Sequence, residues 1–288
     1  MLIKTNRFKT NLYAIFLTIP MKKEDATINS LIPAVLRRGT EKYPTQLEIE
    51  KRLEEMYGAS FNCGVDKIGN YQVLKFYIEG LSNEYTEEKQ NIEELLKEII
   101  YSPVLENGHF KTEYVEQEKE NLKLIIESRK DNKARYAYER CIEEMFENEP
   151  YGVYKYGSVE DVEKVTPESL YNQYKKILED AQINVFGCGN QLEEIEIPHK
   201  NTIEIKNVIH ENKHKEIKEK ADVTQGKLII GLDTPEENKP AITMYNAILG
   251  GGANSKLFQN VREKASLAYS AGSSYIRRIN SIFIKTGI

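Results

Sequence analysis

The sequence predicts an α+β fold built mostly from antiparallel strands, and three observations support this prediction. Strand-like and helix-like segments come in blocks rather than in a regular strand–helix alternation. Two strand-like runs, residues 60–65 and 71–79, follow each other through a turn-like stretch, as in an antiparallel hairpin. The chain has 288 residues, of which 40% are hydrophobic and 30% charged, enough for the core of one or two domains.

The elements of the first half follow from local signals. A strand is expected at Thr10–Pro20, and a helix over residues 25–38 ends at Gly39. Thr45 and Glu48 form a capping box for a helix that runs through residue 56 and precedes the hairpin. Thr166, followed by a proline, is a good N-cap for a helix over 167–180, and a strand follows at 183–186. Three more helices are expected over residues 84–101, 111–129 and 134–148.

The second half begins after a charged stretch. We expect a complete first domain over residues 1–195, a linker rich in Lys and Glu over 196–222, and a homologous second domain over 223–288 that is truncated. Its elements are a strand at 227–232, helices at 241–249 and 255–264, and strands at 268–273 and 281–288. A weak internal repeat supports the homology: a helix, a short segment and two strands occur around residues 56–60 and again around 267–271.

Composition excludes several classes of function. The formal net charge is -5, with basic and acidic residues interleaved, so no basic face for nucleic acid is expected. The apolar run at residues 12–17 is too short to span a membrane and lacks a small-residue cleavage site, so it is interpreted as a buried strand rather than a signal peptide. Cys63, Cys141 and Cys188 are odd in number and far apart, which favours reduced thiols and a cytoplasmic location.

One short pattern would predict a metalloprotease. His210 and His214 enclose a glutamate in an H-E-x-x-H sequence, in which two histidines on one helix face bind zinc and the glutamate acts as a general base. The flanking residues are mostly charged and offer no apolar stripe to hold such a helix against a core. We therefore expect a solvated segment, and an independent metalloprotease is the least favoured of three functional hypotheses.

A second segment resembles the zinc helix of the pitrilysin/insulinase family of peptidases. Residues 30–40 read Ser-Leu-Ile-Pro-Ala-Val-Leu-Arg-Arg-Gly-Thr, where active members carry H-x-x-E-H, an apolar pair and Gly-Thr. The resemblance places Ser30 and Ala34 at the histidine positions and Pro33 at the catalytic glutamate. Because none of these side chains can bind zinc or act as a base, the resemblance implies a site without metal and a chain without a cofactor.

The same resemblance implies the position of a third zinc ligand. The family carries it on a later helix, with another acid two turns earlier, and Glu120 and Glu127 have the required spacing of seven residues. Without the histidines they are interpreted as remnants of the site. An ordinary acidic helix face is the alternative interpretation.

The second half carries another family motif. Residues 249–258 read Leu-Gly-Gly-Gly-Ala-Asn-Ser-Lys-Leu-Phe and resemble the family's glycine-rich turn and helix. In the family, an Arg and a Tyr seven residues apart contact the substrate here, and Arg262 and Tyr269 keep both identity and spacing. The alternative is a surface arginine and a core tyrosine.

The resemblance implies a mitochondrial-processing-peptidase-like fold (LuxS/MPP-like metallohydrolase), with helices packed on one face of an antiparallel sheet. Segments 7–10, 36–44, 53–59 and 225–228 are similar to the YfmF-type proteins of Firmicutes, inactive subunits named for association with 5-aminopentanol modification of elongation factor P.

The expected function is a non-catalytic subunit of a two-component zinc peptidase. It would form a hetero-oligomer with a zinc-bearing homologous subunit, or a homodimer, and bind a peptide or unfolded polypeptide without contacting nucleic acid or membrane. A scaffold protein without a proteolytic role is the alternative.

Overall fold

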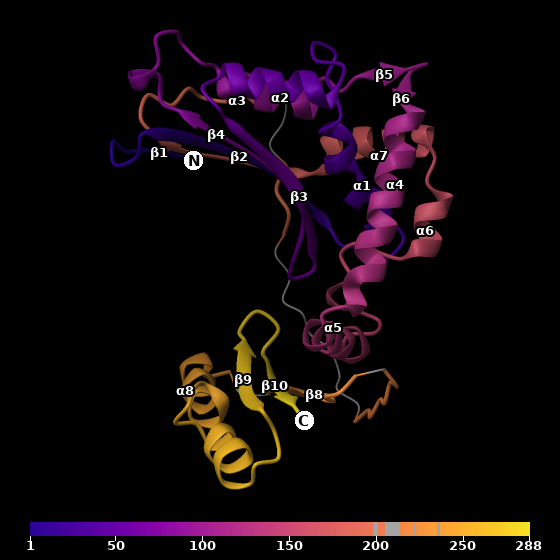
Figure 1. Cartoon of the computed structure of the whole chain (residues 1–288), viewed down its shortest axis with the longest axis vertical. Coiled ribbons are helices and arrows are strands. Elements are labelled where there is room, and N and C mark those ends of the chain that lie inside the picture. Colours follow the sequence, from indigo (N-terminus) through magenta and orange to yellow (C-terminus); the bar gives the residue numbers. More distant parts are fainter. Residues whose placement is uncertain (198–200, 205–213, 222, 235–236) are drawn as a thin grey trace. The chain divides into compact units, whose positions relative to one another are not determined.

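The computed structural model describes the chain except residues 198–200, 205–213, 222 and 235–236 (Figure 1). The chain forms two compact units. The first unit comprises Met1–Ile126 and Lys155–Glu204, and the second comprises Glu127–Tyr154 and Ile205–Ile288. The sequence suggested a boundary after residue 195, whereas contacts assign residues 127–154 to the second unit as well.

The first unit is built on a five-stranded sheet with the order β1-β7-β2-β4-β3. β1 runs parallel to β7, and the other neighbours are antiparallel. A separate pair of two-residue strands, β5 and β6, lies outside this sheet. The strands are β1 (Leu2–Lys4), β2 (Thr10–Pro20), β3 (Ser60–Ile68), β4 (Tyr71–Leu81), β5 (Leu105–Glu106), β6 (His109–Phe110) and β7 (Gln182–Gly189).

Helices cover one face of this sheet, as expected from the sequence (Figure 1). Helix α1 packs on β3, β4 and α7, while α3 packs on β4 and α7 on β2. Ile15 and Leu17 of β2 are therefore buried, whereas Leu12 and Phe186 on the opposite face are exposed. The helices are α1 (Ala26–Leu36), α2 (Gln46–Glu55), η1 (Asn83–Tyr85), α3 (Ile92–Tyr101), α4 (Thr112–Glu127), α6 (Val159–Lys164) and α7 (Pro167–Asp180).

The second unit has a three-stranded antiparallel sheet with the order β8-β10-β9. Helix α5 packs on this sheet: Ile142 of α5 and Phe146, which directly follows α5, share a core with Phe283 of β10, and the Tyr138 ring meets the Phe283 ring edge-on at 5.1 Å. The elements of this unit are η2 (Ser128–Lys130), α5 (Lys133–Met145), η3 (Pro150–Gly152), β8 (Lys227–Asp233), α8 (Lys239–Gly250), η4 (Phe258–Lys264), β9 (Ser270–Ile276) and β10 (Ser281–Gly287).

The two sheets repeat one arrangement. In the first unit the chain order β2, α1, β3, β4 gives the strand order β2-β4-β3, and in the second the chain order β8, α8, β9, β10 gives β8-β10-β9. They differ at one edge, because β2 also pairs with β7, whereas β8 has one strand partner among the described residues. The repeat suggested by residues 56–60 and 267–271 thus has a counterpart in the topology.

Most of the expected elements are present, and several of their boundaries differ, most of all that of the helix expected over residues 84–101. The structure confirms the strand Thr10–Pro20, the helix Pro167–Asp180 and the capping box of Thr45 and Glu48. The helix expected from residue 84 begins only at Ile92. The Asn83 side chain accepts a hydrogen bond from Gln90 N at 2.6 Å and closes the intervening loop. Within the described part of the chain, every helix is too short or too polar to cross a membrane.

Candidate functional site

Helix α1 carries Ser30, Pro33 and Ala34 on a strongly buried segment. Its N-cap residue makes no capping hydrogen bond, and its interior proline lacks an N–H to donate. Burial compensates for these defects, because Leu31, Ile32 and Leu36 are at most 1% exposed. Packing between the sheet and the later helices therefore fixes the positions of the three residues.

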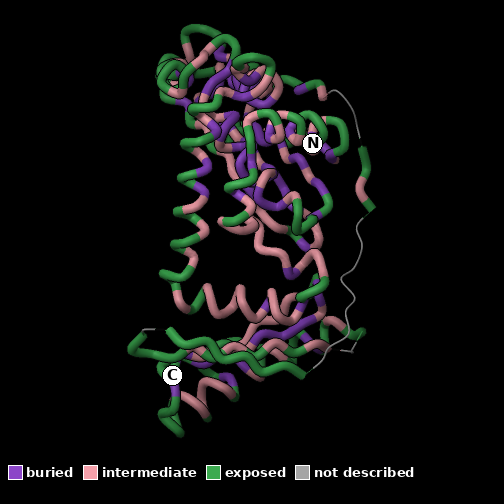
Figure 2. The backbone as a smooth tube through the Cα atoms, turned by 90° about the vertical axis from the view of Figure 1, so that its right-hand side faces the viewer, coloured by how far each residue is buried: buried purple, intermediate pink, exposed green. Residues whose placement is uncertain are grey.

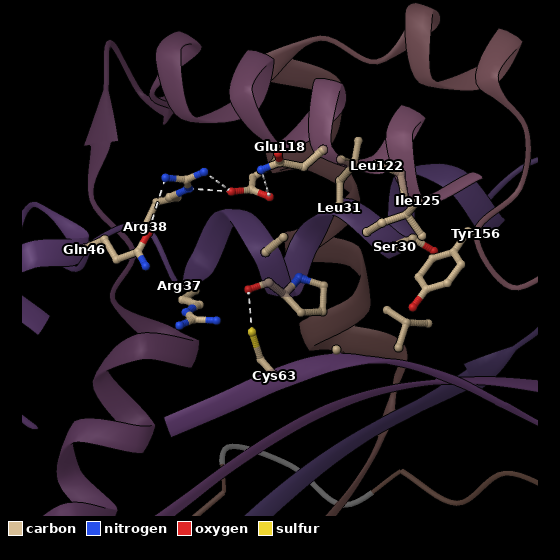
Figure 3. Close-up of a pocket in the computed structure, with 15 residues that line it drawn as sticks. Ser30, Leu31, Arg37, Arg38, Gln46, Cys63, Glu118, Leu122, Ile125 and Tyr156 are labelled. Atoms are coloured by element: carbon tan, nitrogen blue, oxygen red, sulfur yellow. Dashed lines mark hydrogen bonds and ion pairs between the residues drawn. The ribbon is translucent and has the colours of Figure 1, made fainter. Parts of the chain in front are cut away.

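The three residues meet in one cavity of about 380 Å³ (Figure 3). Helix α1 supplies one wall, α4 faces it, β3 forms the floor, and Tyr156 closes one end. The lining residues are Ser30, Leu31, Pro33, Ala34, Arg37, Arg38, Gln46, Cys63, Gly64, Val65, Glu118, Asn121, Leu122, Ile125 and Tyr156.

Helix α4 presents a different pair of residues to this cavity than the sequence suggested. Glu118 and Ile125, seven residues apart, line the cavity, whereas Glu120 and Glu127 do not. Glu120 is exposed and forms an ion pair with Lys123 at 2.8 Å, and Glu127 is exposed at the end of the helix. The two pairs differ by two residues, or about 200° around the helix axis. An apolar isoleucine thus occupies the position that faces Ser30 and Ala34.

The one carboxylate in the cavity wall is already engaged. Glu118 Oε1 accepts a charge-assisted hydrogen bond from Arg38, and Glu118 Oε2 accepts one from Asn121 Nδ2 at 3.2 Å (Figure 3). The Glu118 and Arg38 side chains are 11% and 23% exposed, so solvent screens this pair less than a surface pair. Arg38 Nη1 also donates to Gln46 Oε1 at 3.3 Å. The Arg38 guanidinium thus neutralises the negative charge of Glu118, as a metal ion neutralises its carboxylate ligands in a zinc site.

These residues do not fit a zinc ion. Structural and catalytic zinc sites use at least three side chains of the His, Cys, Asp or Glu type. The cavity offers Cys63 and the engaged Glu118, and no group of three such residues positioned to hold a metal occurs in the described part of the chain. The two candidate side chains in the cavity are therefore fewer than the three that a zinc site needs.

A buried polar network holds α1 to the segment that follows residue 154. Ser30 Oγ lies 2.7 Å from the carbonyl oxygens of both Ala26 and Lys155, and its single proton can bond to one of them at a time. Gln72 Nε2 donates to the same two carbonyls at 3.0 and 2.9 Å. Ser30, at the first histidine position of the motif, thus has a structural role.

Cys63 lies in the floor of the cavity. Its thiol donates to the Pro33 carbonyl at 3.2 Å, and burial raises its pKa to about 12. Because only the thiolate reacts with alkylating reagents, a buried thiol of this kind is inert. Cys63, Cys141 and Cys188 are all free thiols.

We predict that Cys63 resists alkylation in the folded protein. With a pKa near 12, about one thiol in ten thousand is ionised at pH 8, so labelling should be about a thousandfold slower than for an unperturbed cysteine. Peptide mapping after iodoacetamide treatment measures the rate at each cysteine. The control is the same reaction in urea, where the three cysteines should react alike. Rapid labelling of Cys63 in the native state would contradict the prediction.

Arg262 and Tyr269 lie near each other in the second unit. The Arg262 guanidinium carbon is 4.6 Å from the centre of the Phe258 ring and 6.0 Å from that of Tyr269. Tyr269 is 77% exposed, and the Arg262 side chain is 40% exposed beside a long contact to Glu263 of 3.8 Å. Both side chains are therefore accessible to solvent, and the ion pair with Glu263 holds Arg262 only weakly. Arg262 belongs to the π-helical segment η4, a kind of distortion that occurs often at functional sites.

The H-E-x-x-H pattern falls largely outside the described residues. His210 and Glu211 lie there, and His214, which is described, is exposed. The hypothesis of an independent zinc site at these residues gains no support from the structure.

The fold and the site together define a class of protein, an α+β metallopeptidase scaffold with a degenerate zinc site. The positions of the zinc ligands and of the catalytic base carry Ser30, Pro33, Ala34 and Ile125. The family model described as "Peptidase M16 inactive domain" matches residues 164–287. The "Probable inactive metalloprotease YmfF" of Bacillus subtilis (strain 168) is 35% identical over 306 aligned residues, which cover 100% of this chain and 72% of that protein. The chain belongs to the M16 peptidase family, the pitrilysin/insulinase family indicated by the sequence.

Solved structures agree with this assignment. A conserved protein from Enterococcus faecalis V583 matches with a TM-score of 0.84 and 30% identity over 100% of this chain and 72% of its own. A structure described as a peptidase M16 inactive domain, from Pseudomonas fluorescens, matches with a TM-score of 0.72 and 16% identity over 99% of this chain and 71% of its own, a likeness of fold alone.

The sequence did not identify Glu118, Ile125 and Arg38 as residues of the site. The apolar residues Val115 and Leu122 would have indicated the inner face of α4, because they share it with Glu118 and Ile125 at helical spacing. No local signal pairs Arg38 with Glu118, which are 80 residues apart.

Proposed function

We propose that this chain is the non-catalytic subunit of a two-component M16 peptidase, which pairs with a zinc-bearing homologous subunit. The supporting observation is the contrast between its two motif regions. The metal-binding positions on α1 and α4 carry residues that cannot bind zinc, whereas Arg262 and Tyr269 lie together at an exposed position. Selection for structure alone would not require an exposed Arg–Tyr pair.

The proposed chemistry is divided between the subunits. Peptide hydrolysis needs a metal and an activated water, which the sister subunit would supply. It also needs hydrogen-bond donors where negative charge develops in the transition state. In this chain the Arg262 guanidinium and the Tyr269 hydroxyl would be those donors and would hold the peptide or unfolded polypeptide substrate. A location in the cytoplasm and a link to elongation factor P modification are parts of the proposal that rest on cysteine usage and on sequence resemblance.

Reconstitution tests the division of roles. The pure chain should bind no zinc and hydrolyse no peptide, and addition of the zinc-bearing subunit should give hydrolysis that a chelator abolishes. Hydrolysis by the chain alone, lost with a chelator, would refute the division. A stable complex without any gain in hydrolysis would favour the scaffold alternative. Mass measurement of elongation factor P from cells without this chain tests the link to its modification.

We predict that Arg262→Ala and Tyr269→Phe each lower the hydrolysis rate of the reconstituted complex by about 100-fold, the usual effect of removing one donor from a transition-state site. Initial rates with a fluorogenic peptide measure the effect. Lys264→Ala, at an exposed basic residue of the same helix, and Tyr245→Phe, at an exposed tyrosine of α8, are matched controls that should leave the rate unchanged. Equal rates for all four variants would mean that the pair does not contact the substrate.

A further inference from the structure

Helix α5 carries a stripe of charged and polar side chains along one side. The stripe consists of Tyr136, Arg140 and Glu144 of α5 and of Glu147 just beyond its end, which recur at intervals of three or four residues. Ile142, which belongs to the core between α5 and the sheet, is two residues from both Arg140 and Glu144, or about 200° around the helix axis. The stripe therefore faces away from the sheet of the second unit.

Lys215, from the charged linker, binds the C-terminal end of the stripe. Its Nζ atom forms one ion pair with Glu144 and another with Glu147 Oε2 at 3.0 Å. Glu144 also accepts a hydrogen bond from Arg140 Nη2 at 2.6 Å, so its carboxylate lies between two cations. Lys215 lowers the pKa of Glu144, and Glu144 in turn raises the pKa of Lys215. Both groups are therefore charged at neutral pH.

Glu219, four residues further along the linker, binds the N-terminal end of the stripe. Its Oε1 atom accepts a hydrogen bond from Arg140 Nε at 2.8 Å, and its Oε2 atom accepts one from the Tyr136 hydroxyl at 3.1 Å. The other two nitrogens of the Arg140 guanidinium donate to Glu143 and Glu144, each at 2.6 Å. The guanidinium is thus held in one orientation by three carboxylates, and it lowers the pKa of Glu219.

The positions of the two anchors fit a chain that runs antiparallel to α5. Residues 214–221 form neither helix nor strand, and an extended backbone rises about 13 Å from Lys215 to Glu219. The helix rises about 11 Å between the middle of one bound pair and the middle of the other. Because these lengths agree, both ends can be bound at once. Binding at one end then keeps the other end close to its partners, so that individually weak surface ion pairs act together.

Strand β8, which follows the linker in the sequence, lies on the other side of α5. Its Gly231 meets α5 so closely that an added Cβ atom would lie 2.6 Å from Met145 Sδ and 3.3 Å from Cys141 Sγ. Helix α5 is therefore held between the sheet on its apolar side and residues 215–219 on its charged side. The two attachments differ in kind, because screening by salt weakens ion pairs but not the burial of apolar side chains.

We propose that residues 215–219 are an electrostatic strap, which fastens the linker along α5 at low ionic strength and releases it at high ionic strength. The Lys215 and Glu219 side chains are 43% and 42% exposed, so counter-ions reach the contacts. The Debye length falls from about 10 Å at 0.1 M salt to about 3 Å at 1 M salt, which removes most of the attraction between exposed charges. The apolar core on the other side of α5 remains, so the linker is freed while the second unit stays folded.

Limited digestion of the full chain with trypsin tests the strap. The measured quantity is the rate of cleavage after Lys218, which lies between the two anchors, relative to the wild-type rate at the same salt concentration, so that the effect of salt on trypsin cancels. Arg140→Gln should raise this rate about tenfold at about 20 mM salt and leave it unchanged at about 1 M, where the wild-type strap is already released. Lys133→Gln makes the same change of charge at the first residue of α5, outside the stripe, and should have no effect at either concentration. Equal rates for the wild type and Arg140→Gln at the low salt concentration would overturn the proposal.

A charge exchange separates release of the strap from damage to α5. Lys215→Glu places like charges beside Glu144 and Glu147 and should speed cleavage after Lys218. Adding Glu147→Lys restores an opposite pair at this end of the strap and should slow the cleavage again toward the wild-type rate. The Glu147 side chain is 67% exposed, so its replacement leaves the core intact, and circular dichroism checks that each variant keeps its helix content. If Lys215→Glu and the double variant are cleaved at the same rate, ion pairs do not hold the linker to α5 and the proposal fails.

Discussion

The variant Ser30→His/Ala34→His/Ile125→Glu is expected to bind about one zinc ion per chain. Residues 30 and 34 are four apart on α1 and share a helix face, and residue 125 faces them across the cavity. Two imidazoles and one carboxylate are a ligand set that zinc accepts, with a water in the fourth position. Metal analysis after dialysis gives the stoichiometry, and calorimetry gives the affinity.

The double variant Ser30→His/Ala34→His is the matched control, because it retains Glu120 and Glu127. If Ile125 marks the position of the third ligand, the triple variant should bind zinc on the order of 100-fold more tightly than the double variant. Equal affinities would contradict the helix face assigned to α4. Tight binding by the double variant, lost on Glu127→Gln, would restore the face suggested by the sequence.

The substitution Gly157→Ala is expected to destabilise the first unit by about 3 kcal/mol. Gly157 has φ of +69°, and a Cβ atom there would lie 1.8 Å from Thr27 Oγ1 and 2.9 Å from Thr27 N. The variant combines a left-handed backbone with overpacking against α1. It would also disturb the hydrogen bond that Ser158 N donates to Thr27 Oγ1 at 3.2 Å. Urea unfolding followed by circular dichroism measures the loss.

Gly108→Ala separates the two contributions. Gly108 has φ of +82°, but a Cβ atom there would meet nothing within 4 Å, so this variant should lose only about 1 kcal/mol. A similar loss of unfolding free energy for both variants would mean that Thr27 of α1 can shift away from residue 157 at little energetic cost.

Local sequence signals predicted the elements that are specified locally. The alternation of Thr10–Pro20 and the N-cap at Thr166 determine β2 and α7 without reference to the rest of the chain. The parallel pairing of β1 with β7 and the association of α5 with the second unit are long-range, and no local pattern encodes them. An amphipathic helix such as α5 shows which face is buried, but not which sheet buries it.

The sequence predicted the site, like the fold, only in part. The loss of ligands at Ser30, Pro33 and Ala34 follows from residue identity alone. The face of α4 does not, because Glu118 and Ile125 have the same spacing as Glu120 and Glu127. Only packing distinguishes the pairs: Val115, Lys119 and Leu122 are buried, whereas the opposite side of the helix is exposed (Figure 2).

The assignment of residues 127–154 to the second unit has a consequence for cleavage of the chain. The backbone passes between the units at residues 126/127, 154/155 and 204/205. A protease that cut once between residues 214 and 221 would leave α5 joined to the N-terminal fragment, while the core of Ile142, Phe146 and Phe283 would still hold α5 to the C-terminal fragment. The nicked protein should therefore migrate as one particle under native conditions and separate into two fragments only when denatured.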